Sequence, residues 1–383
     1  MYTRVLEAPS RSFFLFGPRA TGKSTWLGQH FAAARSFDLL DSALRLRLLR
    51  DAAAFAMMVQ AEPRGSWIVV DEIQLVPTLL GECHRLMEKG GYRFAMTGSS
   101  TRKLRRGGGN LLAGRASLRH LYPLTGQEID GEVEIAERIE LGCLPQVVTA
   151  EDRGTKLDIL EAYALTYLRE EIQAEALVRD LGAFARFLEV AALANAQVTN
   201  VSAIARDAGV QRPTVQGYFE VLTDTLVATL LPAWRPRARI KEQAHPKFYW
   251  FDSGVARAMS GRLRTPCERE ERGHLFETYV LHELRAHNDY ARLGGALSYW
   301  RTASGVEVDF VWSRGKENVA IEVKSSPVWK REYGAGLAAL AEAAPLTACY
   351  GVYGGKERLV DGKLKVLPVT EFLDRLYAGK ILD

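Results

Sequence analysis

The segment 17–25 constrains this chain most, because its sequence GPRATGKST matches the pattern GxxxxGK[ST] in full. An apolar run at 12–16 precedes it and predicts a buried strand, and residues 24–31 can begin a helix. Where a strand, a glycine loop and a helix N-terminus meet, backbone N–H groups converge and the helix dipole favours negative charge. A chance match is the alternative, but this context predicts an α/β fold that binds the phosphates of a nucleoside triphosphate.

The loop has a predicted division of labour. Lys23 is expected to reach the β- and γ-phosphates and to act in catalysis, and the Ser24 hydroxyl is expected to ligate Mg²⁺. The nucleotide-binding assignment covers the whole segment, which consists of Gly17, Pro18, Arg19, Ala20, Thr21, Gly22, Lys23, Ser24 and Thr25.

A second apolar strand, at 67–70, leads into two carboxylates, Asp71 and Glu72. Asp71 is expected to contact the nucleotide site and position Mg²⁺, and Glu72 is expected to orient and deprotonate the attacking water. Acidic residues at strand ends are common. Together with the phosphate loop, however, this pair predicts hydrolysis of the nucleotide and not only its binding.

Further strands complete an alternating α/β pattern. Strand-like runs lie at 37–41, 92–97 and 117–121. The run at 92–97 is followed by hydroxyl side chains, among which Ser99 is predicted to contact the γ-phosphate or the water. A simple Ser/Thr turn is the alternative.

A basic, glycine-rich segment lies at 102–110. Such segments are usually solvated and mobile. A guanidinium delivered to a γ-phosphate nevertheless stabilises the charge of the transition state strongly. Arg115 is our first candidate for this catalytic role, and Arg102 is the second.

The middle of the chain contains a helix-turn-helix pattern. Residues 201–210 predict a short helix that ends at a glycine, and 211–222 begin a second helix with Pro213 in its first turn. Strand-like runs follow at 227–231 and 247–251. The loop between these runs carries four basic residues, Arg235, Arg237, Arg239 and Lys241. The outline predicts a winged helix that contacts duplex DNA, and a lid or an assembly contact is the alternative.

The last third of the chain carries carboxylates and a lysine in a suggestive order. A helix at 272–290 contains Glu277, and the strands after it carry Asp309 and then Glu322 and Lys324. Residues two apart in a strand project to one face. Such a cluster can bind Mg²⁺ and activate water against a phosphodiester, which assigns the three carboxylates to metal binding and the lysine to catalysis. Alternating charges on an exposed strand face are the alternative.

With these blocks in order, the whole chain resembles a family of prokaryotic AAA-type P-loop ATPases. Members end in a domain of unknown function from the restriction-endonuclease-like, PD-(D/E)xK superfamily. The resemblance rests on GPRATGKST at 17–25, VVDEIQ at 69–74, TGSS at 97–100, LLAGR at 111–115, IARDAGVQRPTVQGYFEVLTDT at 204–225, KFYWFDSGVARA at 247–258, GHLFETYVLHEL at 273–284, YWRTASGVEVDF at 299–310 and IEVKSS at 321–326.

The resemblance implies ATP as the nucleotide, with Asp71 and Glu72 as the Walker B pair. It also implies that the nuclease-like cluster consists of Glu277, Asp309, Glu322 and Lys324, none of which departs from the family pattern. Because such ATPases often assemble, a homo-oligomer is expected, with a neighbour's arginine completing the site.

We therefore expect an α/β protein with four parts. These are a P-loop AAA-type ATPase core at 1–125, a helical lid or linker at 126–196, a winged helix-turn-helix at 197–262, and a PD-(D/E)xK nuclease-like, restriction-endonuclease-like α/β domain at 263–383.

Composition narrows the class of protein further. Of the 383 residues, 47% are hydrophobic and 25% charged, which describes a globular chain. The net charge of +4 permits nucleic acid as a partner. No apolar run is long enough to span a bilayer, and residues 1–11 lack the apolar core of a signal peptide. We expect a cytoplasmic protein without a membrane partner.

Three functions follow from these features. The leading hypothesis is an ATPase that binds DNA through the winged helix and couples ATP turnover to the nuclease-like domain. The second is a metal-dependent DNA endonuclease gated by ATP. The third is a nucleotide-controlled switch whose C-terminal domain has an inactive nuclease fold and docks a protein partner.

Overall fold

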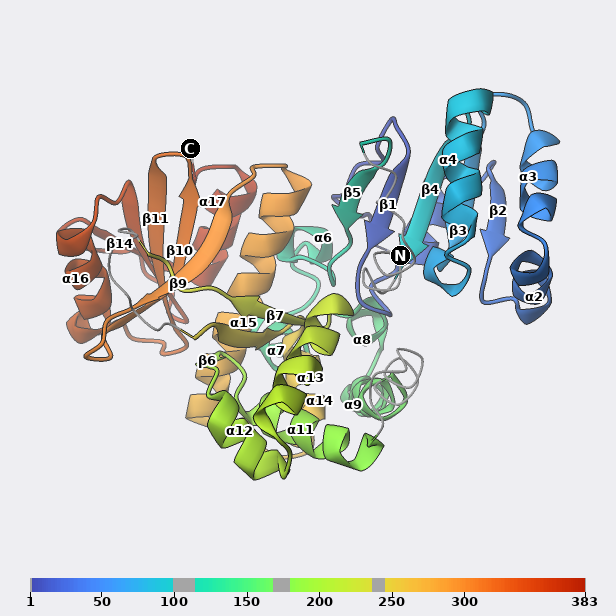
Figure 1. Ribbon diagram of the computed structural model, residues 1–383. Coiled ribbons are helices and arrows are strands. Elements are labelled where there is room, and N and C mark those ends of the chain that lie inside the picture. Colours follow the sequence, from blue (N-terminus) through green and yellow to red (C-terminus); the bar gives the residue numbers. More distant parts are fainter. Residues whose placement is uncertain (1, 99–113, 168–179, 236–244, 383) are drawn as a thin grey trace. The chain divides into compact units, whose positions relative to one another are not determined.

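The computed structural model describes residues 2–98, 114–167, 180–235 and 245–382. The chain folds as two compact units, which Figure 1 draws in sequence colours. The N-terminal unit comprises 2–124 together with 221–227, and the C-terminal unit comprises 125–220 and 228–383. Among the described residues, no helix combines the length and the hydropathy that a membrane span requires.

In its described part, the N-terminal unit contains one sheet of five parallel strands in the order β2-β3-β4-β1-β5. We call it the parallel sheet. Its strands are β1 (Phe13–Phe16), β2 (Arg35–Asp38), β3 (Trp67–Asp71), β4 (Arg93–Gly98) and β5 (Ser117–His120). The helices are α1 (Lys23–His30), α2 (Ser42–Arg50), α3 (Ala52–Gln60) and α4 (Leu79–Gly90), with a 3₁₀ turn at η1 (Ile73–Leu75). The predicted parallel α/β architecture of this part is confirmed.

The register of the parallel sheet brings its candidate site residues to one edge. Phe16 at the end of β1 pairs with Gly98 at the end of β4, and Val70 of β3 pairs with Met96. The carboxyl ends of β1, β3 and β4 therefore lie side by side. In open parallel sheets this edge is where ligands bind. The strand predicted at 37–41 ends earlier, at Asp38, because Asp41 caps α2 by accepting from Ala43 N–H and Leu44 N–H.

The first half of the C-terminal unit is mainly helical, as its apolar spacing predicts. Its helices are α6 (Gly126–Ile129), α7 (Ile135–Leu141), α8 (Pro145–Thr149), α9 (Arg153–Ala162), the π-helix η2 (Tyr163–Tyr167), α11 (Leu181–Leu193), α12 (Val201–Ala208), α13 (Arg212–Asp224) and α14 (Ser253–Met259). Helices α12 and α13 lie at the positions predicted for the helix-turn-helix, and Gly209 ends α12 with a φ of 67°. Glycine adopts this left-handed conformation without steric cost.

A small antiparallel sheet belongs to the same region. Its described strands are β6 (Gln197–Val198), β7 (Ala228–Leu231) and β8 (Lys247–Trp250), with β8 in the centre. The chain beyond β7 then joins a strand of the next domain, because Trp234 N–H donates to Tyr299 O at 2.5 Å and Tyr299 N–H donates to Pro232 O at 3.0 Å. The Tyr299 hydroxyl donates to His245 O. One tyrosine thus holds both ends of the segment predicted as the wing.

The second half of the C-terminal unit contains a mixed sheet with helices on both faces. The described strands are β9 (Ala296–Arg301), β10 (Glu307–Arg314), β11 (Glu317–Lys324), β12 (Ala348–Tyr353), β13 (Leu359–Asp361) and β14 (Leu364–Pro368), in the order β13-β14-β12-β11-β10-β9. After the 3₁₀ turn η3 (Arg331–Gly334), α16 (Ala335–Ala343) covers one face, and α15 (Arg269–Tyr290) with α17 (Val369–Tyr377) covers the other (Figure 1). Strands β13 and β14 and helix α17 extend the order of elements that the sequence predicts.

A bulge in the mixed sheet sets the direction of one predicted site residue. Val308 pairs with Trp300, but Val311 pairs with Ser298, so β10 has one more residue than β9 between these pairs. Val308 and Val311 both join the core beneath α16. The extra residue therefore re-aims the strand between them, which contains Asp309.

Candidate functional site

The phosphate loop joins β1 to α1 with a backbone that only small residues allow. A Cβ on Gly17 would lie 2.4 Å from Leu121 O, so the chain cannot carry a side chain there without moving. Gly22 precedes α1 with a φ of 90°, and no side chain caps this helix among the described residues. The first N–H groups of α1 are therefore oriented toward the loop opening, as an anion site requires.

Lys23 lies across this loop. Its Nζ donates to Gly17 O at 2.8 Å and to Pro18 O at 3.0 Å, and the residue is 6% exposed. Thr21 Oγ1 donates to the same Pro18 O at 2.9 Å and stiffens the turn. The ammonium is thus held beside the backbone that would surround a phosphate group.

Asp71 connects the loop to the ends of two other strands. Ser24 Oγ donates to Asp71 Oδ2 at 2.6 Å, and Thr97 Oγ1 donates to Asp71 Oδ1. Thr97 in turn accepts from Glu72 N–H at 2.9 Å. A hydroxyl and a carboxylate are the oxygen ligands that Mg²⁺ prefers, so Ser24 and Asp71 fit the ion that the sequence predicts between them. No role was predicted for Thr97 from the sequence, although it lies two positions before Ser99, the hydroxyl residue that was predicted.

Glu72 leaves the strand direction at the point where β3 ends. Its φ of 58° is left-handed, which is uncommon for a residue with a side chain. Gln74 Nε2 donates to Glu72 Oε2, and Gln74 is itself 5% exposed. A Cβ on Gly98 would lie 2.8 Å from Gln74 Oε1, so the glycine leaves room for this amide. Gln74 positions the carboxylate that is predicted to act on water.

Arg4 is a site residue that no sequence pattern indicates. Its Nη1 donates to Thr21 O at 2.8 Å and its Nη2 donates to Tyr122 O at 2.6 Å. The guanidinium therefore ties the phosphate loop to the segment that follows β5. Trp26 Nε1 also donates to Leu6 O at 3.2 Å, which attaches the N-terminal segment to α1.

Other predicted residues of the nucleotide site are not brought to the loop by any described contact. Arg115 Nε donates to Glu88 Oε1 of α4 at 2.9 Å, and both side chains are largely exposed. Ser99 and Arg102 lie outside the described residues, as do Arg237, Arg239 and Lys241 of the predicted wing. Arg235 is described and exposed.

The mixed sheet brings the second predicted cluster together. Asp309 Oδ2 accepts from Val323 N–H at 2.9 Å and lies 3.7 Å from Lys324 Nζ, which also donates to Glu322 Oε1. Glu277 of α15 is buried beside them. Glu277, Asp309, Glu322 and Lys324 therefore share one buried region, as their order in the sequence suggests.

A lysine that the sequence did not assign enters the centre of this cluster. Lys247, the first residue of β8, places its Nζ 2.8 Å from Glu277 Oε1, 2.5 Å from Glu307 Oε1 and 3.4 Å from Asp309 Oδ1. Its side chain is 3% exposed. Tyr249, on the same face of β8, donates its hydroxyl to Glu277 Oε1. We call Lys247, Tyr249, Glu277, Glu307, Asp309, Glu322 and Lys324 the carboxylate cluster.

The acids of the carboxylate cluster differ in the direction in which their pKa values are shifted. Burial raises the pKa of Glu277 to about 7 and that of Glu322 to about 8. Burial also opposes ionisation of Asp309, but Lys324 and Lys247 outweigh it and hold the pKa of Asp309 below its usual value. Glu322 Oε2 is buried and has no hydrogen-bond partner within the described part of the chain, which suits a neutral carboxyl better than a charged one.

This geometry does not suit the metal site predicted at Glu277, Asp309 and Glu322. Among the described residues, no group of three or more His, Cys, Asp or Glu side chains is placed to hold a metal ion. The physical reason is that two ammonium groups already lie between the carboxylates. The sequence pattern contains the acids but does not reveal Lys247, which comes from another sheet.

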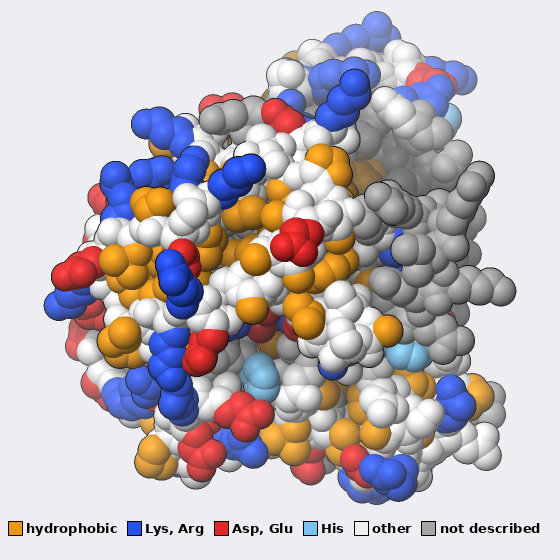
Figure 2. Space-filling model, turned by 90° about the vertical axis from the view of Figure 1, so that its left-hand side faces the viewer, with side chains coloured by type: hydrophobic (Ala, Val, Ile, Leu, Met, Phe, Trp, Pro, Cys, Tyr) orange, Lys and Arg blue, Asp and Glu red, His pale blue; other side chains and the backbone are white. Residues whose placement is uncertain are grey.

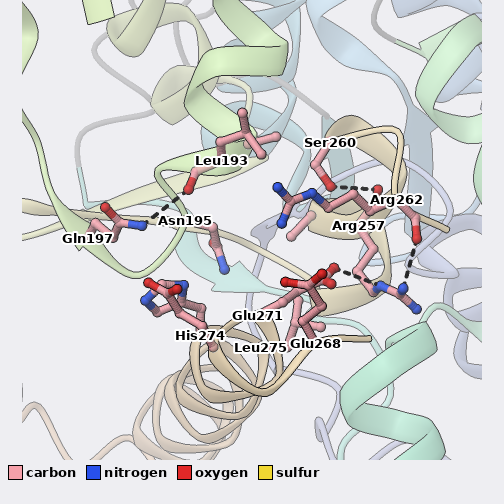
Figure 3. Close-up of a pocket in the computed structure, with 13 residues that line it drawn as sticks. Leu193, Asn195, Gln197, Arg257, Ser260, Arg262, Glu268, Glu271, His274 and Leu275 are labelled. Atoms are coloured by element: carbon pink, nitrogen blue, oxygen red, sulfur yellow. Dashed lines mark hydrogen bonds and ion pairs between the residues drawn. The ribbon is translucent and has the colours of Figure 1, made fainter. Parts of the chain in front are cut away.

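A pocket of about 300 Å³ lies near the start of α15, where Glu268, Glu271 and His274 face Arg257 and Asn195 (Figure 3). The guanidinium of Arg257 is fully buried and bonds Glu271 Oε1 at 2.9 Å and Arg262 O at 2.7 Å. Burial lowers the pKa of the His274 imidazole below its usual value. The ion pair between Arg257 and Glu271 therefore connects α14 to α15.

Comparison with known protein families agrees with the N-terminal site. Residues 9–130 match the family model described as an AAA domain, which supports an AAA-type P-loop domain at this end of the chain. Residues 132–265 match a domain of unknown function (DUF8612), and residues 272–372 match another (DUF4143). The models for the last two segments carry no functional description.

Two mycobacterial proteins are similar over most of the chain. They are the uncharacterized protein Mb2031c of Mycobacterium bovis and the uncharacterized protein Rv2008c of Mycobacterium tuberculosis. Each is 27% identical over 353 residues, which cover 90% of this chain and 76% of the relative.

Solved structures overlap only weakly. Can2 from Sulfobacillus thermosulfidooxidans in complex with cyclic tetra-adenylate is 10% identical, covers 97% of this chain and 100% of its own, and has a TM-score of 0.25. Protein VC1899 from Vibrio cholerae is 11% identical, covers 96% of both chains, and has a TM-score of 0.20. These scores are too low to define a shared fold.

Proposed function

We propose that this protein binds ATP at the phosphate loop and hydrolyses it. The observation that carries the proposal is the convergence of the loop, Asp71 and Glu72 at one edge of the parallel sheet, where Ser24 Oγ lies 2.6 Å from Asp71 Oδ2. The match of residues 9–130 to an AAA domain supports it.

The roles of the side chains follow from this arrangement. Lys23 exchanges its two loop carbonyls for phosphate oxygens, and the N–H groups at the start of α1 bind the same phosphates. Ser24 and Asp71 would hold Mg²⁺, which when bound neutralises phosphate charge. Glu72, held by Gln74 and by its left-handed backbone, accepts the proton of the attacking water. Arg115 or a neighbouring subunit's arginine is our candidate for stabilising the transition state.

Phosphate release from ATP by the purified protein tests this function. We expect turnover with Mg²⁺ that disappears in Glu72→Gln, while the variant still binds nucleotide. If the wild type releases phosphate no faster than Glu72→Gln, the proposed hydrolysis is wrong.

We further propose that the helix-turn-helix binds duplex DNA. Arg212 and Gln216 in the first turns of α13 are exposed, as is Gln211 just before the helix. Val215 and Tyr218 are buried, so one polar face of this helix is uncovered. Arginine and glutamine are the side chains that contact phosphates and base edges in a major groove. If DNA neither binds nor changes the rate of ATP hydrolysis, this second function is wrong.

If the helix-turn-helix does not bind DNA, one observation favours a protein partner instead. Figure 2 shows hydrophobic side chains gathered on the face that carries α16, with Lys and Arg side chains around them. Val328 and Val360 of this domain are 65% and 72% exposed. Exposed apolar patches with a polar rim are typical of protein-binding surfaces.

A further inference from the structure

The carboxylate cluster occupies the place where the sequence predicts a divalent cation. We infer that the ammonium group of Lys247 takes the position of that cation, so that the C-terminal domain of this chain is built to work without a metal. This inference goes beyond the proposed ATP hydrolysis and does not depend on it.

The donors of Lys247 match the acceptors around it in number. An ammonium group can donate three hydrogen bonds and accepts no hydrogen bond. Within the described residues, Lys247 Nζ lies near three carboxylate oxygens, at 2.8 Å from Glu277, 2.5 Å from Glu307 and 3.4 Å from Asp309. The carboxylates come from a helix and from two positions of β10, so they surround the ammonium as ligands surround an ion. The lysine is thus a complete partner for this site.

Several of the carboxylate oxygens that Mg²⁺ would need already accept hydrogen bonds, and Glu322 Oε2, which has no partner among the described residues, is a single oxygen. Mg²⁺ requires near-octahedral coordination by oxygens at about 2.0–2.1 Å. Glu277 Oε1 accepts from both Lys247 and Tyr249, and Asp309 Oδ2 accepts from Val323 N–H. Glu322 Oε1 accepts from Lys324. An ion entering this space would have to displace an ammonium group whose side chain is only 3% exposed.

Lys247 is also held in place by the strand that carries it. Lys247 belongs to the central strand of the small antiparallel sheet, where its Cα partners are Val198 on one side and Leu231 on the other. Withdrawal of its backbone would break both ladders. Tyr249 lies two residues further on, on the same face, and holds the same carboxylate of Glu277. The strand therefore presents two side chains to the cluster in a fixed register.

Manganese binding without nucleotide tests the inference, with electron paramagnetic resonance counting bound Mn²⁺. The wild type and Asp309→Asn should bind Mn²⁺ equally, because any ion at the phosphate loop is common to both. Lys247→Met should gain one site at least tenfold tighter than any that the wild type has in this domain. The double variant Lys247→Met with Asp309→Asn should lose it, and Lys365→Met, an exposed lysine of β14, should behave as the wild type.

Two outcomes overturn the inference. One is a Mn²⁺ site in the wild type that Asp309→Asn removes. The other is a folded Lys247→Met protein, judged by circular dichroism, that gains no site. If Lys247→Met does not fold, the comparison of the wild type with folded Asp309→Asn decides alone. Equal binding then supports the inference, and a lost site contradicts it.

Discussion

Ser24 Oγ lies 2.6 Å from Asp71 Oδ2, which joins the first turn of α1 to the end of β3 across 47 positions of the chain. The hydroxyl and the carboxylate that are predicted to share Mg²⁺ are therefore in contact before any ion is considered. Thr97 belongs to β4, the strand between β1 and β3, and its hydroxyl donates to the other carboxylate oxygen of Asp71. These contacts join residues of β3 and β4 to the first turn of α1.

Lys23→Ala should abolish tight binding of ATP. The variant removes the ammonium that bridges Gly17 O and Pro18 O, and with it the charge that would meet the phosphates. Hydrogen bonds to charged groups contribute about 1.5–3 kcal/mol, so ATP affinity should fall by about ten- to a hundredfold. Titration with a fluorescent ATP analogue measures this, with Lys89→Ala, an exposed lysine of α4, as the control. Equal affinity in both variants would contradict the role of Lys23.

Glu72→Gln should separate binding from hydrolysis. The amide keeps the shape of the side chain but cannot accept a proton, so turnover should fall by about 10²–10⁴-fold while nucleotide affinity is kept. Gln74→Ala should lower kcat about tenfold with little change in KM, because it frees the carboxylate of Glu72 without touching the phosphate loop. A Gln74→Ala protein that changes only in KM would argue against a positioning role.

Arg4→Ala should weaken nucleotide binding from outside the loop. Its guanidinium bonds Thr21 O and Tyr122 O, and no other side chain in the described residues is shown to make this bridge. Loss of these charge-assisted bonds should destabilise the N-terminal unit by about 1.5–3 kcal/mol. Thermal unfolding with and without ATP measures both effects. Arg11→Ala, an exposed arginine before β1, is the matched control and should leave both unchanged.

The stability of the C-terminal unit should fall as the pH rises. Burial raises the pKa of Glu283 from its ordinary value of 4.5 to about 7, although Gly126 N–H and the Tyr377 hydroxyl donate to it. The folded state therefore binds this proton more tightly than the unfolded chain does. The resulting stability is fully present below about pH 4.5 and is lost as the pH rises through about 7.

Glu283→Gln should reduce this pH dependence, because the amide does not titrate. Urea unfolding near pH 5 and near pH 8 measures the difference in unfolding free energy for each protein. The decline should be smaller in Glu283→Gln than in the wild type, and Glu357→Gln, an exposed acid, should decline as the wild type does. A decline in Glu283→Gln as large as in the wild type would show that another group carries the effect.

Arg212→Ala should weaken binding to duplex DNA. The residue is exposed at the start of α13, where it can pair with a phosphate. Removing one such contact should reduce the slope of log affinity against log salt by about 1. Fluorescence anisotropy at several salt concentrations gives this slope, and Lys356→Ala of the C-terminal domain is the control. Identical slopes for the two variants would exclude α13 as the contact.

The sequence predicts that the phosphate loop and Asp71 meet, because each of these parts is local. Ser24 follows a glycine loop and Asp71 ends an apolar strand, and parallel strands bring such ends to one edge. The role of Arg4 could not be predicted in this way, because its partner Tyr122 lies 118 positions away and no pattern marks the pair. The last strands, β13 and β14, are three and five residues long, too short for a clear alternation.

The role of Lys247 could not be predicted either, because its partners are also distant in the sequence. The strand predicted at 247–251 is present as β8, but no pattern in the sequence links its first residue to the carboxylates. Lys247 and Glu277 are 30 positions apart in the chain, and only tertiary packing brings the lysine among the carboxylates. Buried lysines are rare, so a sequence reading assigns them to the surface by default.

The ion pair of Lys247 with Glu277 also bears on how such proteins can be inherited and recombined. It crosses the boundary between the matched segments 132–265 and 272–372. A gene fragment that began at the second segment would encode Glu277 and Glu307 without Lys247, and a shuffled chimera would combine acids from one parent with position 247 of another. We therefore expect a chimera that exchanges one of the two segments to fold less stably than a chimera that exchanges both.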